Sequence, residues 1–317
     1  MGNIGWHKCG SFGGFCHAIM VPDKVWPGRP GFLLSMVAGH VPRGRRAKRG
    51  IMRGVGAVTI FLGGVKVELT VVEHIDVPEL HLYCLSDIHL GSPDCDEDLL
   101  MHDIEMIMRD DAARVILNGD LLHYDIKSSR GDVYHQKYPP SQQKRLLRQM
   151  LEPIRDKIIA MIGGNHDERR TEEDATPVQD IAEALDVRYL CGEGLFKLQI
   201  GTKPNRKPAA YVIYCTHGWT AARLIGGKAL NLHRLSDIVL ADVYIISHTH
   251  TPMIFADSYF VPDTRNNNVM QVSRYYVNTG SYQRRGNYPI TKGLRPTVLG
   301  TPLITLSGTQ KKVEVKL

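Results

Sequence analysis

The sequence of 317 residues is long enough for one large domain or two small ones. Its apolar content of 43% and charged content of 23% are ordinary for a globular protein. No apolar stretch approaches the roughly 18 residues that a membrane-spanning helix needs. Six cysteines in a chain of this length predict reduced core residues rather than a disulfide framework. We therefore expect a cytoplasmic protein with no membrane partner.

The net charge of +6 is carried by the N-terminal part of the chain. Residues 1–75 contain ten Lys and Arg against three Asp and Glu, whereas the remainder contains 29 against 30. Residues 1–50 are rich in Gly and Pro, lack helical or strand periodicity and include the basic run 43–49. We predict a disordered basic extension over 1–50, for which nucleic-acid binding is the alternative to a solvated tail.

A β-hairpin is predicted to lead into the main domain over residues 51–79. Two apolar runs, 58–62 and 65–72, flank the pair Gly63-Gly64, which is typical of a hairpin with a two-residue turn. The main domain is then expected over residues 80–317.

From residue 80 onward, predicted strands alternate with predicted helices, and strands alone follow residue 250. We predict helices at 96–109, 140–151, 176–185 and 230–240. Further strands are predicted at 82–85, 115–117, 157–162, 211–215, 243–246, 269–277, 302–306 and 312–315. Gly226-Gly227-Lys228 lacks the spacing of a P-loop and is interpreted as a flexible loop. This order of elements favours two sheets packed together with helices outside them.

Five of the predicted strands end in Asp, Asn or His side chains. In chain order these ends carry Asp87 and His89, Asp120, Asn165 and His166, His217, and His248 and His250. Ligands of open α/β sheets bind outside the carboxyl ends of the strands. The five ends therefore predict one shared site with Asp120 at its centre.

Carboxylate, imidazole and amide groups around an acidic centre suit divalent ions of borderline hardness, such as those of Mn, Fe, Zn or Ni. A carboxylate can bridge two such ions, and two ions about 3.5–4 Å apart can hold a shared hydroxide and clamp a phosphate for in-line attack. The spacing lacks the Glu-x-x-His pairs of a helix-based two-metal site and the cysteines of a structural zinc site. We expect two divalent ions, with Mn²⁺ favoured.

The five strand ends resemble the ordered blocks of the calcineurin-like metallophosphoesterases. The blocks are Asp87-x-His89, Gly119-Asp120, Gly164-Asn165-His166-Asp167, Thr216-His217-Gly218 and Ser247-His248-x-His250. The resemblance extends from about residue 82 to the turn 278–281, and Ser247 stands where the family usually has Gly. It implies an α/β fold, a four-layer α/β/β/α sandwich of two mixed sheets with flanking helices.

The resemblance also implies a role for each residue. One metal ion would be bound by Asp87, His89, Asp120 and His250. The other would be bound by Asp120, Asn165, His217 and His248. His166 would stay off the metals and act as the general acid on the leaving oxygen, supported by Asp87.

Two further residues are candidates for binding the substrate. Arg169, followed by Arg170, comes directly after the Asn-His-Asp block, and a guanidinium suits a phosphate oxygen. His123 lies three residues after Asp120. A solvated surface position is the alternative for the arginine pair, and a rim position without function is the alternative for His123. The polar stretch 125–140 is expected to overhang the cleft.

The blocks also bear on the substrate. Residues 121–124, Leu-Leu-His-Tyr, stand where the protein Ser/Thr phosphatases of this family have Val-Asp-Arg-Gly. Asp-x-His-Leu-Gly together with Gly-Asp-Leu-Leu-His is similar to the nuclease subunit of SbcCD-type DNA repair complexes. The patterns Tyr-x-Gln, Pro-Ser-x-Gln and Asn-His-Asp-x-Arg look closest to small phage and bacterial metallophosphoesterases. We expect a hydrolase that cleaves a phosphodiester of a nucleotide or nucleic acid. A phosphomonoesterase, a DNA-repair-type nuclease and an inactive interaction scaffold are the alternatives, and the oligomeric state stays open.

Overall fold

The computed structural model describes residues 55–317 apart from 63–64, 73, 128, 130–132, 170–176, 203–207, 287–289, 291–292 and 294. The predicted extension 1–50 lies outside the described residues, and the predicted division of the chain at residues 50 and 79 stays a prediction. The strands are β1 (Val55–Leu62), β2 (Val65–Val72), β3 (Glu79–Leu85), β4 (Ala113–Asn118), β5 (Ile158–Ile162), β6 (Tyr189–Leu190), β7 (Glu193–Ile200), β8 (Ala209–Thr216), β9 (Val243–Ile246), β10 (Met253–Asp263), β11 (Asn268–Asn278), β12 (Leu303–Ser307) and β13 (Val313–Lys316). The helices are α1 (Glu97–Arg109), α2 (Pro140–Leu151), α3 (Pro177–Ala184) and α4 (Ile225–His233), with 3-10 helices η1 (Val133–His135), η2 (Glu152–Lys157) and η3 (Arg234–Asp237).

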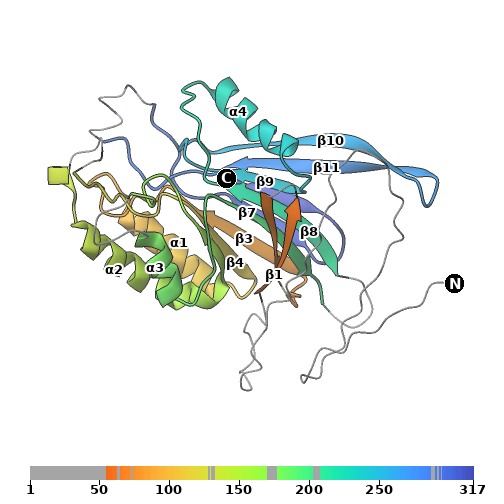
Figure 1. Ribbon diagram of the computed structural model, residues 1–317, viewed down its shortest axis with the longest axis horizontal. Helices are drawn as coiled ribbons and strands as arrows, with labels where there is room; N and C mark the ends of the chain where they lie inside the picture. Colours follow the sequence, from red (N-terminus) through yellow and green to blue (C-terminus); the bar gives the residue numbers. More distant parts are fainter. Residues whose placement is uncertain are drawn as a thin grey trace, which may run out of the picture. The chain divides into compact units, whose positions relative to one another are not determined.

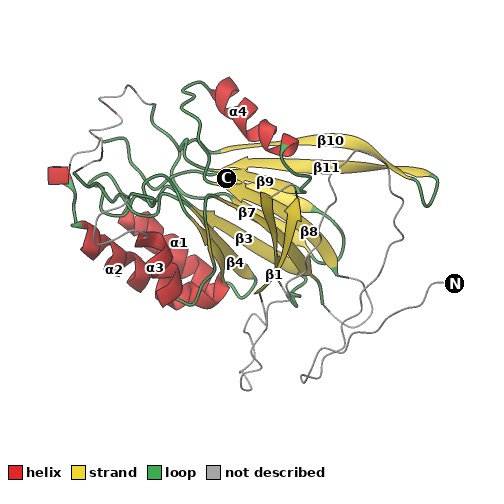
Figure 2. Ribbon diagram, viewed as in Figure 1, coloured by secondary structure: helices red, strands yellow, loops and turns green. Residues whose placement is uncertain are grey.

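Two mixed sheets form the centre of the described part of the chain, as predicted (Figure 1). The larger has the strand order β1-β2-β7-β8-β9-β11-β10, and the smaller has the order β13-β12-β3-β4-β5-β6. The hairpin β1–β2 joins the larger sheet through parallel pairing of β2 with β7. Helices α1, α2 and α3 cover the smaller sheet, and α4 lies on the larger one (Figure 2). These are the four layers of the expected α/β/β/α sandwich.

Strand β4 lies at the centre of the smaller sheet and is covered on both faces. Val115 and Leu117 pack among the helices, whereas Ile116 belongs to the apolar cluster between the two sheets. All six residues of β4 are buried as a result. Burial on both faces explains why this strand has a continuous apolar run instead of an alternating pattern.

Helix α1 follows its local sequence signals closely. The Asp96 side chain caps the helix by accepting a hydrogen bond of 3.2 Å from Leu99 N. Leu100 and Ile107 lie two turns apart on the buried face. Met108, the residue after Ile107, is 47% exposed. It lies about 100° around the helix axis from Ile107, which turns its side chain toward solvent.

The fourth predicted helix, 230–240, is shifted in the structure. Helix α4 begins five residues earlier and ends at His233, where η3 follows. Gly226-Gly227-Lys228, interpreted above as a flexible loop, lies in its first turns. Glycine weakens a helix by about 1 kcal/mol, but Lys228 Nζ donates a hydrogen bond of 3.1 Å to Thr249 O. This tertiary contact, which the local sequence does not reveal, helps to hold the helix in place.

Two strands of the larger sheet, β7 and β10, have no counterpart among the predicted strands. In β7, buried Phe196, Leu198 and Ile200 alternate with half-buried residues. This alternation is the pattern of a half-buried strand, so the sequence did contain a signal for β7. Strand β10 pairs only with β11 and has no buried residue along its length, so no apolar face marks it in the sequence.

A chain of buried hydrogen bonds joins the sheets beneath the carboxyl ends of their strands. Ser86 Oγ lies 2.7 Å from Thr279 Oγ1, which donates to Ser247 Oγ at 2.9 Å. Asn118 Nδ2 donates to Ser247 Oγ at 2.6 Å and to Thr216 O at 2.9 Å. Ser247, the residue that departs from the family pattern, therefore connects the ends of β4, β9 and β11.

Replacing Ser247 with alanine is expected to lower the free energy of unfolding by about 1–3 kcal/mol, because Asn118 Nδ2 stays buried and loses one acceptor. Urea denaturation measures this change. Ser258→Ala is the matched control, since Ser258 Oγ makes a single exposed contact of 3.1 Å with Ser273 and should change stability by only about 0.5 kcal/mol. Equal effects of the two substitutions would contradict the structural role of Ser247.

Candidate metal centre

The structure brings all seven predicted metal ligands together at the carboxyl ends of β3, β4, β5, β8 and β9. Hydrogen bonds between the turns hold them there. Asp87 N donates to Gly119 O at 3.0 Å, and His89 N donates to Asp120 O at 2.9 Å. His248 N donates to Asp87 Oδ2 at 3.0 Å, which joins the larger sheet to the smaller one.

Five of these seven residues have a positive backbone φ, which is uncommon for residues with a side chain. They are Asp87 (48°), His89 (48°), Asp120 (50°), His248 (69°) and His250 (51°). Each such residue costs about 1–3 kcal/mol, and the conformation persists only where the surrounding structure enforces it. The concentration of strain in these turns points to a functional site independently of the side-chain chemistry.

The turns approach closely because two of their residues lack a side chain. Gly119 has a φ of +84°, and a Cβ atom on it would lie 2.5 Å from His217 Nδ1. A Cβ atom on Gly164 would lie 2.2 Å from Asp120 N. Any larger residue at either position would force the turns apart.

The first ligand group consists of Asp87, His89, Asp120 and His250. His250 Nε2 lies 3.2 Å from Asp87 Oδ1 and 3.2 Å from His89 Nε2. His89 Nε2 lies 3.7 Å from Asp120 Oδ2. The side chains of Asp87, His89 and Asp120 are buried, so few water molecules compete for their ligand atoms.

The second ligand group consists of Asp120, Asn165, His217 and His248. His217 Nε2 lies 3.2 Å from Asp120 Oδ2 and 3.3 Å from His248 Nδ1. One end of the Asn165 amide lies 3.3 Å from Asp120 Oδ2 and 2.9 Å from His248 Nδ1. Asp120 Oδ2 therefore takes part in both groups.

These separations fit divalent metal ions. Two ligand atoms about 2.1 Å from the same ion lie about 3.0–3.4 Å apart, and every separation above except the 3.7 Å one is close to that range. His217 Nδ1 donates to Asn118 O at 2.9 Å, which directs the Nε2 lone pair into the group. The Asn165 amide fits too: with its nitrogen toward Asp120 and His248 it donates to both, and with its oxygen turned there instead it would add a ligand.

Charges of opposite sign control ionisation in the second group. Burial would raise the pKa of Asp120, but the charge and hydrogen bond of His217 hold it well below its usual range. Burial would lower the pKa of His217, and the nearby Asp120 carboxylate outweighs this and raises it to about 10. A divalent ion that binds here would compete with the proton on His217.

His166, the predicted general acid, lies beside the first ligand group, with its ring centroid 4.5 Å from that of His89. His166 Nδ1 lies 2.8 Å from His123 O, which can only accept, so this nitrogen carries the proton. His166 Nε2 accepts a hydrogen bond of 3.0 Å from Arg169 Nη2. Burial lowers the pKa of His166 to about 4; Asp120 opposes this decrease and Arg169 adds to it.

The partners of His166 differ from those implied by the resemblance. Support from Asp87 was expected, whereas the two ring nitrogens contact His123 and Arg169. His89, His123 and His166 also lie close enough for a third metal group. The Arg169 cation next to His166 Nε2, and the carbonyl oxygen next to Nδ1, leave His166 no free lone pair for that purpose.

Both predicted substrate-binding residues lie at the same corner of the site. Arg169 Nη1 forms an ion pair with Asp125 Oδ1 and lies 2.9 Å from His123 O and 3.4 Å from Tyr124 O. His123 Nε2 lies 3.1 Å from Asp125 Oδ2. Arg170 lies outside the described residues. We call the group of His123, Asp125, His166 and Arg169 the His166 corner.

Two buried acidic residues near the ligands have no role in the sequence-based prediction. Asp125 contacts both His123 and Arg169, as described above. Asp167 accepts hydrogen bonds from Leu121 N at 3.0 Å and from Gly164 N at 3.1 Å, which joins the turns after β4 and β5. Asp167 closes the block that begins at Gly164, and Asp125 lies five residues after Asp120, but their partners are up to 46 residues away in the chain.

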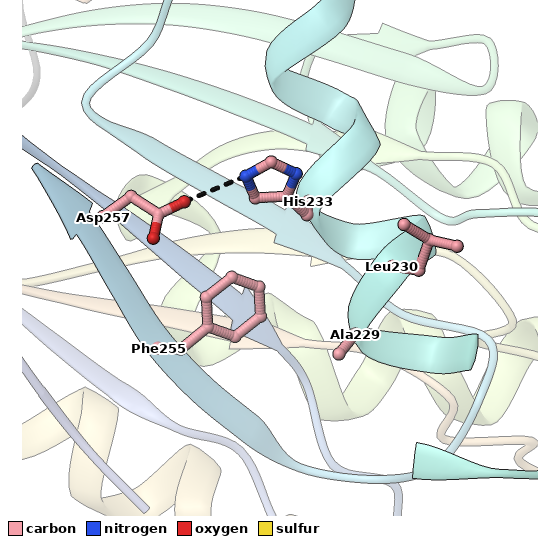
Figure 3. Close-up of a pocket in the computed structure, with 5 residues that line it drawn as sticks. All are labelled: Ala229, Leu230, His233, Phe255 and Asp257. Atoms are coloured by element: carbon pink, nitrogen blue, oxygen red, sulfur yellow. Dashed lines mark hydrogen bonds and ion pairs between the residues drawn. The ribbon is translucent and has the colours of Figure 1, made fainter. Parts of the chain in front are cut away.

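A separate depression lies between α4 and β10 (Figure 3). It is lined by Ala229, Leu230, His233, Phe255 and Asp257, none of which is a predicted site residue. His233 Nε2 and Asp257 Oδ2 face each other across it at 2.9 Å. The candidate chemistry therefore lies elsewhere, in the ligand-bearing turns.

Comparison with solved structures finds several matches at low sequence identity. A predicted phosphoesterase from Streptococcus pneumoniae TIGR4 is 14% identical, covers 75% of this chain and 90% of its own, and gives a TM-score of 0.34. A metallophosphoesterase from Sphaerobacter thermophilus is 15% identical, with coverages of 74% and 87% and a TM-score of 0.36. The nuclease MPE from Pseudomonas putida is 13% identical, with coverages of 74% and 87% and a TM-score of 0.30.

The search of curated proteins returned no match. In the described ranges, none of the helices has the length and apolar character required to span a bilayer.

The family model for calcineurin-like phosphoesterases matches residues 80–278, which is more than half of the sequence and includes every ligand-bearing turn. The chain therefore belongs to the calcineurin-like phosphoesterase family.

Proposed function

We propose that this protein is a two-metal hydrolase that cleaves a phosphodiester of a nucleotide or nucleic acid. The observation that supports this most strongly is the sharing of Asp120 Oδ2 between two ligand groups. When bound, two divalent ions would activate a water molecule as the nucleophile and neutralise charge on the phosphate. We propose Mn²⁺ because the groups mix carboxylate, amide and imidazole donors.

The residues of the chain have distinct roles in this proposal. The first group of Asp87, His89, Asp120 and His250 binds one ion, and the second group of Asp120, Asn165, His217 and His248 binds the other. The proton for the leaving oxygen comes from His166 Nε2, because Nδ1 is already engaged by the carbonyl of His123; Nε2 takes up this proton from water once the Arg169 N–H turns away from it. Arg169 and His123 contact the substrate from the His166 corner.

The charge of the His166 corner favours a diester. Its one cationic side chain, Arg169, is already paired with Asp125. A phosphodiester carries one negative charge, whereas a monoester carries about 1.5–2 near neutral pH. The inactive scaffold is less well supported, since five strained ligand residues, at about 1–3 kcal/mol each, would serve no purpose in it.

Protein reconstituted with Mn²⁺ is expected to bind two ions per chain and to hydrolyse bis-p-nitrophenyl phosphate faster than p-nitrophenyl phosphate. Chelation should abolish both activities. Metal analysis at saturation and initial rates on the two esters measure these outcomes. One ion or none would contradict the two-metal site, a faster monoester would favour the phosphomonoesterase, and no hydrolysis of either ester would favour the scaffold.

A further inference from the structure

We propose that Arg169 contacts the same phosphoester oxygen as His166, the oxygen that leaves, and that Asp125 is the positioning residue that aims it there. This inference deepens the proposed function and rests on it. It differs from the sequence-based expectation of a general phosphate contact, because it assigns one edge of the guanidinium to one oxygen.

The two edges of the Arg169 guanidinium have different surroundings. Nη1 is engaged by the Asp125 carboxylate and by the carbonyl oxygens of His123 and Tyr124. Nη2 has one hydrogen-bond partner in the described part of the chain, His166 Nε2 at 3.0 Å. The contacts of Nη1 would be enough to hold an arginine with a purely structural role. They do not account for the contact of Nη2 with the proposed acid.

The backbone of Asp125 is held from both its N–H and its carbonyl, so this residue can serve as an anchor. Its backbone N donates to Gln136 Oε1 at 3.0 Å, and Gln136 Nε2 donates to its carbonyl oxygen at 2.8 Å. Gln136 Oε1 also accepts from Gln143 Nε2 at 2.8 Å, and Gln143 is fully buried. Side chains locked by such a supporting network hold their partners to the narrow tolerances that catalysis requires.

The geometry allows both groups to reach one oxygen. Two nitrogens 3.0 Å apart, each within about 2.7–3.2 Å of the same oxygen, form a nearly equilateral triangle with it. In that arrangement the Arg169 N–H turns from His166 Nε2 to the oxygen, and Nε2 becomes free to take a proton from water. As the P–O bond breaks, that proton passes to the leaving oxygen, while Arg169 keeps its proton and neutralises the developing charge.

Arg169→Ala tests the proposal with two readouts, both on Mn²⁺-loaded protein. Isothermal titration with inorganic phosphate should show binding weakened by about ten- to a hundredfold, the effect of losing a hydrogen bond to a charged group. In a series of methyl aryl phosphodiesters, kcat should fall more for phenols of high pKa than for p-nitrophenol. Asp125→Asn, which keeps the shape of the anchor, should cause a smaller loss of the same kind.

Arg188→Ala is the matched control. Arg188 is also paired with a carboxylate, that of Glu68, and its side chain is 27% exposed against 20% for Arg169. This variant should leave phosphate binding and the dependence on the leaving group unchanged.

The double variant His166→Ala/Arg169→Ala separates the proposal from a general phosphate contact. If both residues act on one oxygen, losing Arg169 should slow the His166→Ala protein much less than the parent. Fully additive effects, or unchanged phosphate binding with an equal slowing of all esters, would overturn the proposal. If the parent hydrolyses no ester, the proposed function fails, and phosphate titration still decides whether Arg169 binds the anion.

Discussion

Asp120→Asn is expected to remove both metal ions and to lower kcat/KM by at least about a thousandfold. The shared oxygen, Asp120 Oδ2, lies 3.7 Å from His89 Nε2 in one ligand group and 3.2 Å from His217 Nε2 in the other. An amide of the same shape keeps the volume but removes the charge that attracts both cations. Each ion contributes several kcal/mol of charge stabilisation, and each 1.4 kcal/mol corresponds to a factor of ten.

Metal analysis and steady-state kinetics on bis-p-nitrophenyl phosphate measure this result. Asp110→Asn is the matched control, because Asp110 binds His81 Nδ1 at 2.7 Å and belongs to neither ligand group. It should retain both ions and full activity. Asn165→Ala provides a graded comparison. Because Asn165 belongs to the second group alone, this substitution should weaken the binding of chiefly one ion. An Asp120→Asn protein that kept two ions would show that this carboxylate does not link the groups.

The position of the ligands could be predicted from the sequence because the relevant signals are local. Each ligand follows an apolar run within a few residues, and the carboxyl ends of strands that share a sandwich meet at one edge. The run before Asp120 and the run before His248 are both buried strands, as predicted. Hence the site could be located without knowledge of the pairing order of the strands.

The contacts of the His166 corner could not be predicted in this way. Asp125 and Arg169 are 44 residues apart, and the local sequence around either residue does not predict their contact. The same limit applies to α4, where the contact of Lys228 with the turn after β9 helps to hold a helix that contains a glycine pair. In α4 the tertiary contact opposes local propensity, and in the His166 corner it joins residues that local sequence does not relate.

His166→Ala is expected to keep both metal ions and to slow hydrolysis of alkyl and nucleotide esters by about 10²–10⁴-fold, the usual contribution of a positioned acid or base. The ions should stay because His166 belongs to neither ligand group; its ring nitrogens contact His123 O and Arg169 Nη2. The rate loss should depend on the ester. An alkoxide leaves slowly without a proton, whereas p-nitrophenolate leaves well unaided and should suffer less.

The comparison of a nucleotide ester with a p-nitrophenyl ester, on protein whose metal content has been measured, tests this expectation. His233→Ala is the matched control, since His233 also pairs with a carboxylate, that of Asp257 at 2.9 Å, but lies on α4 outside the ligand groups. That variant should hydrolyse both esters at the parent rate. Loss of metal from His166→Ala, or an equal slowing of the two ester types, would exclude His166 as the general acid. A selective loss on the poorer leaving group would assign the proton transfer to the corner formed by His166 and Arg169.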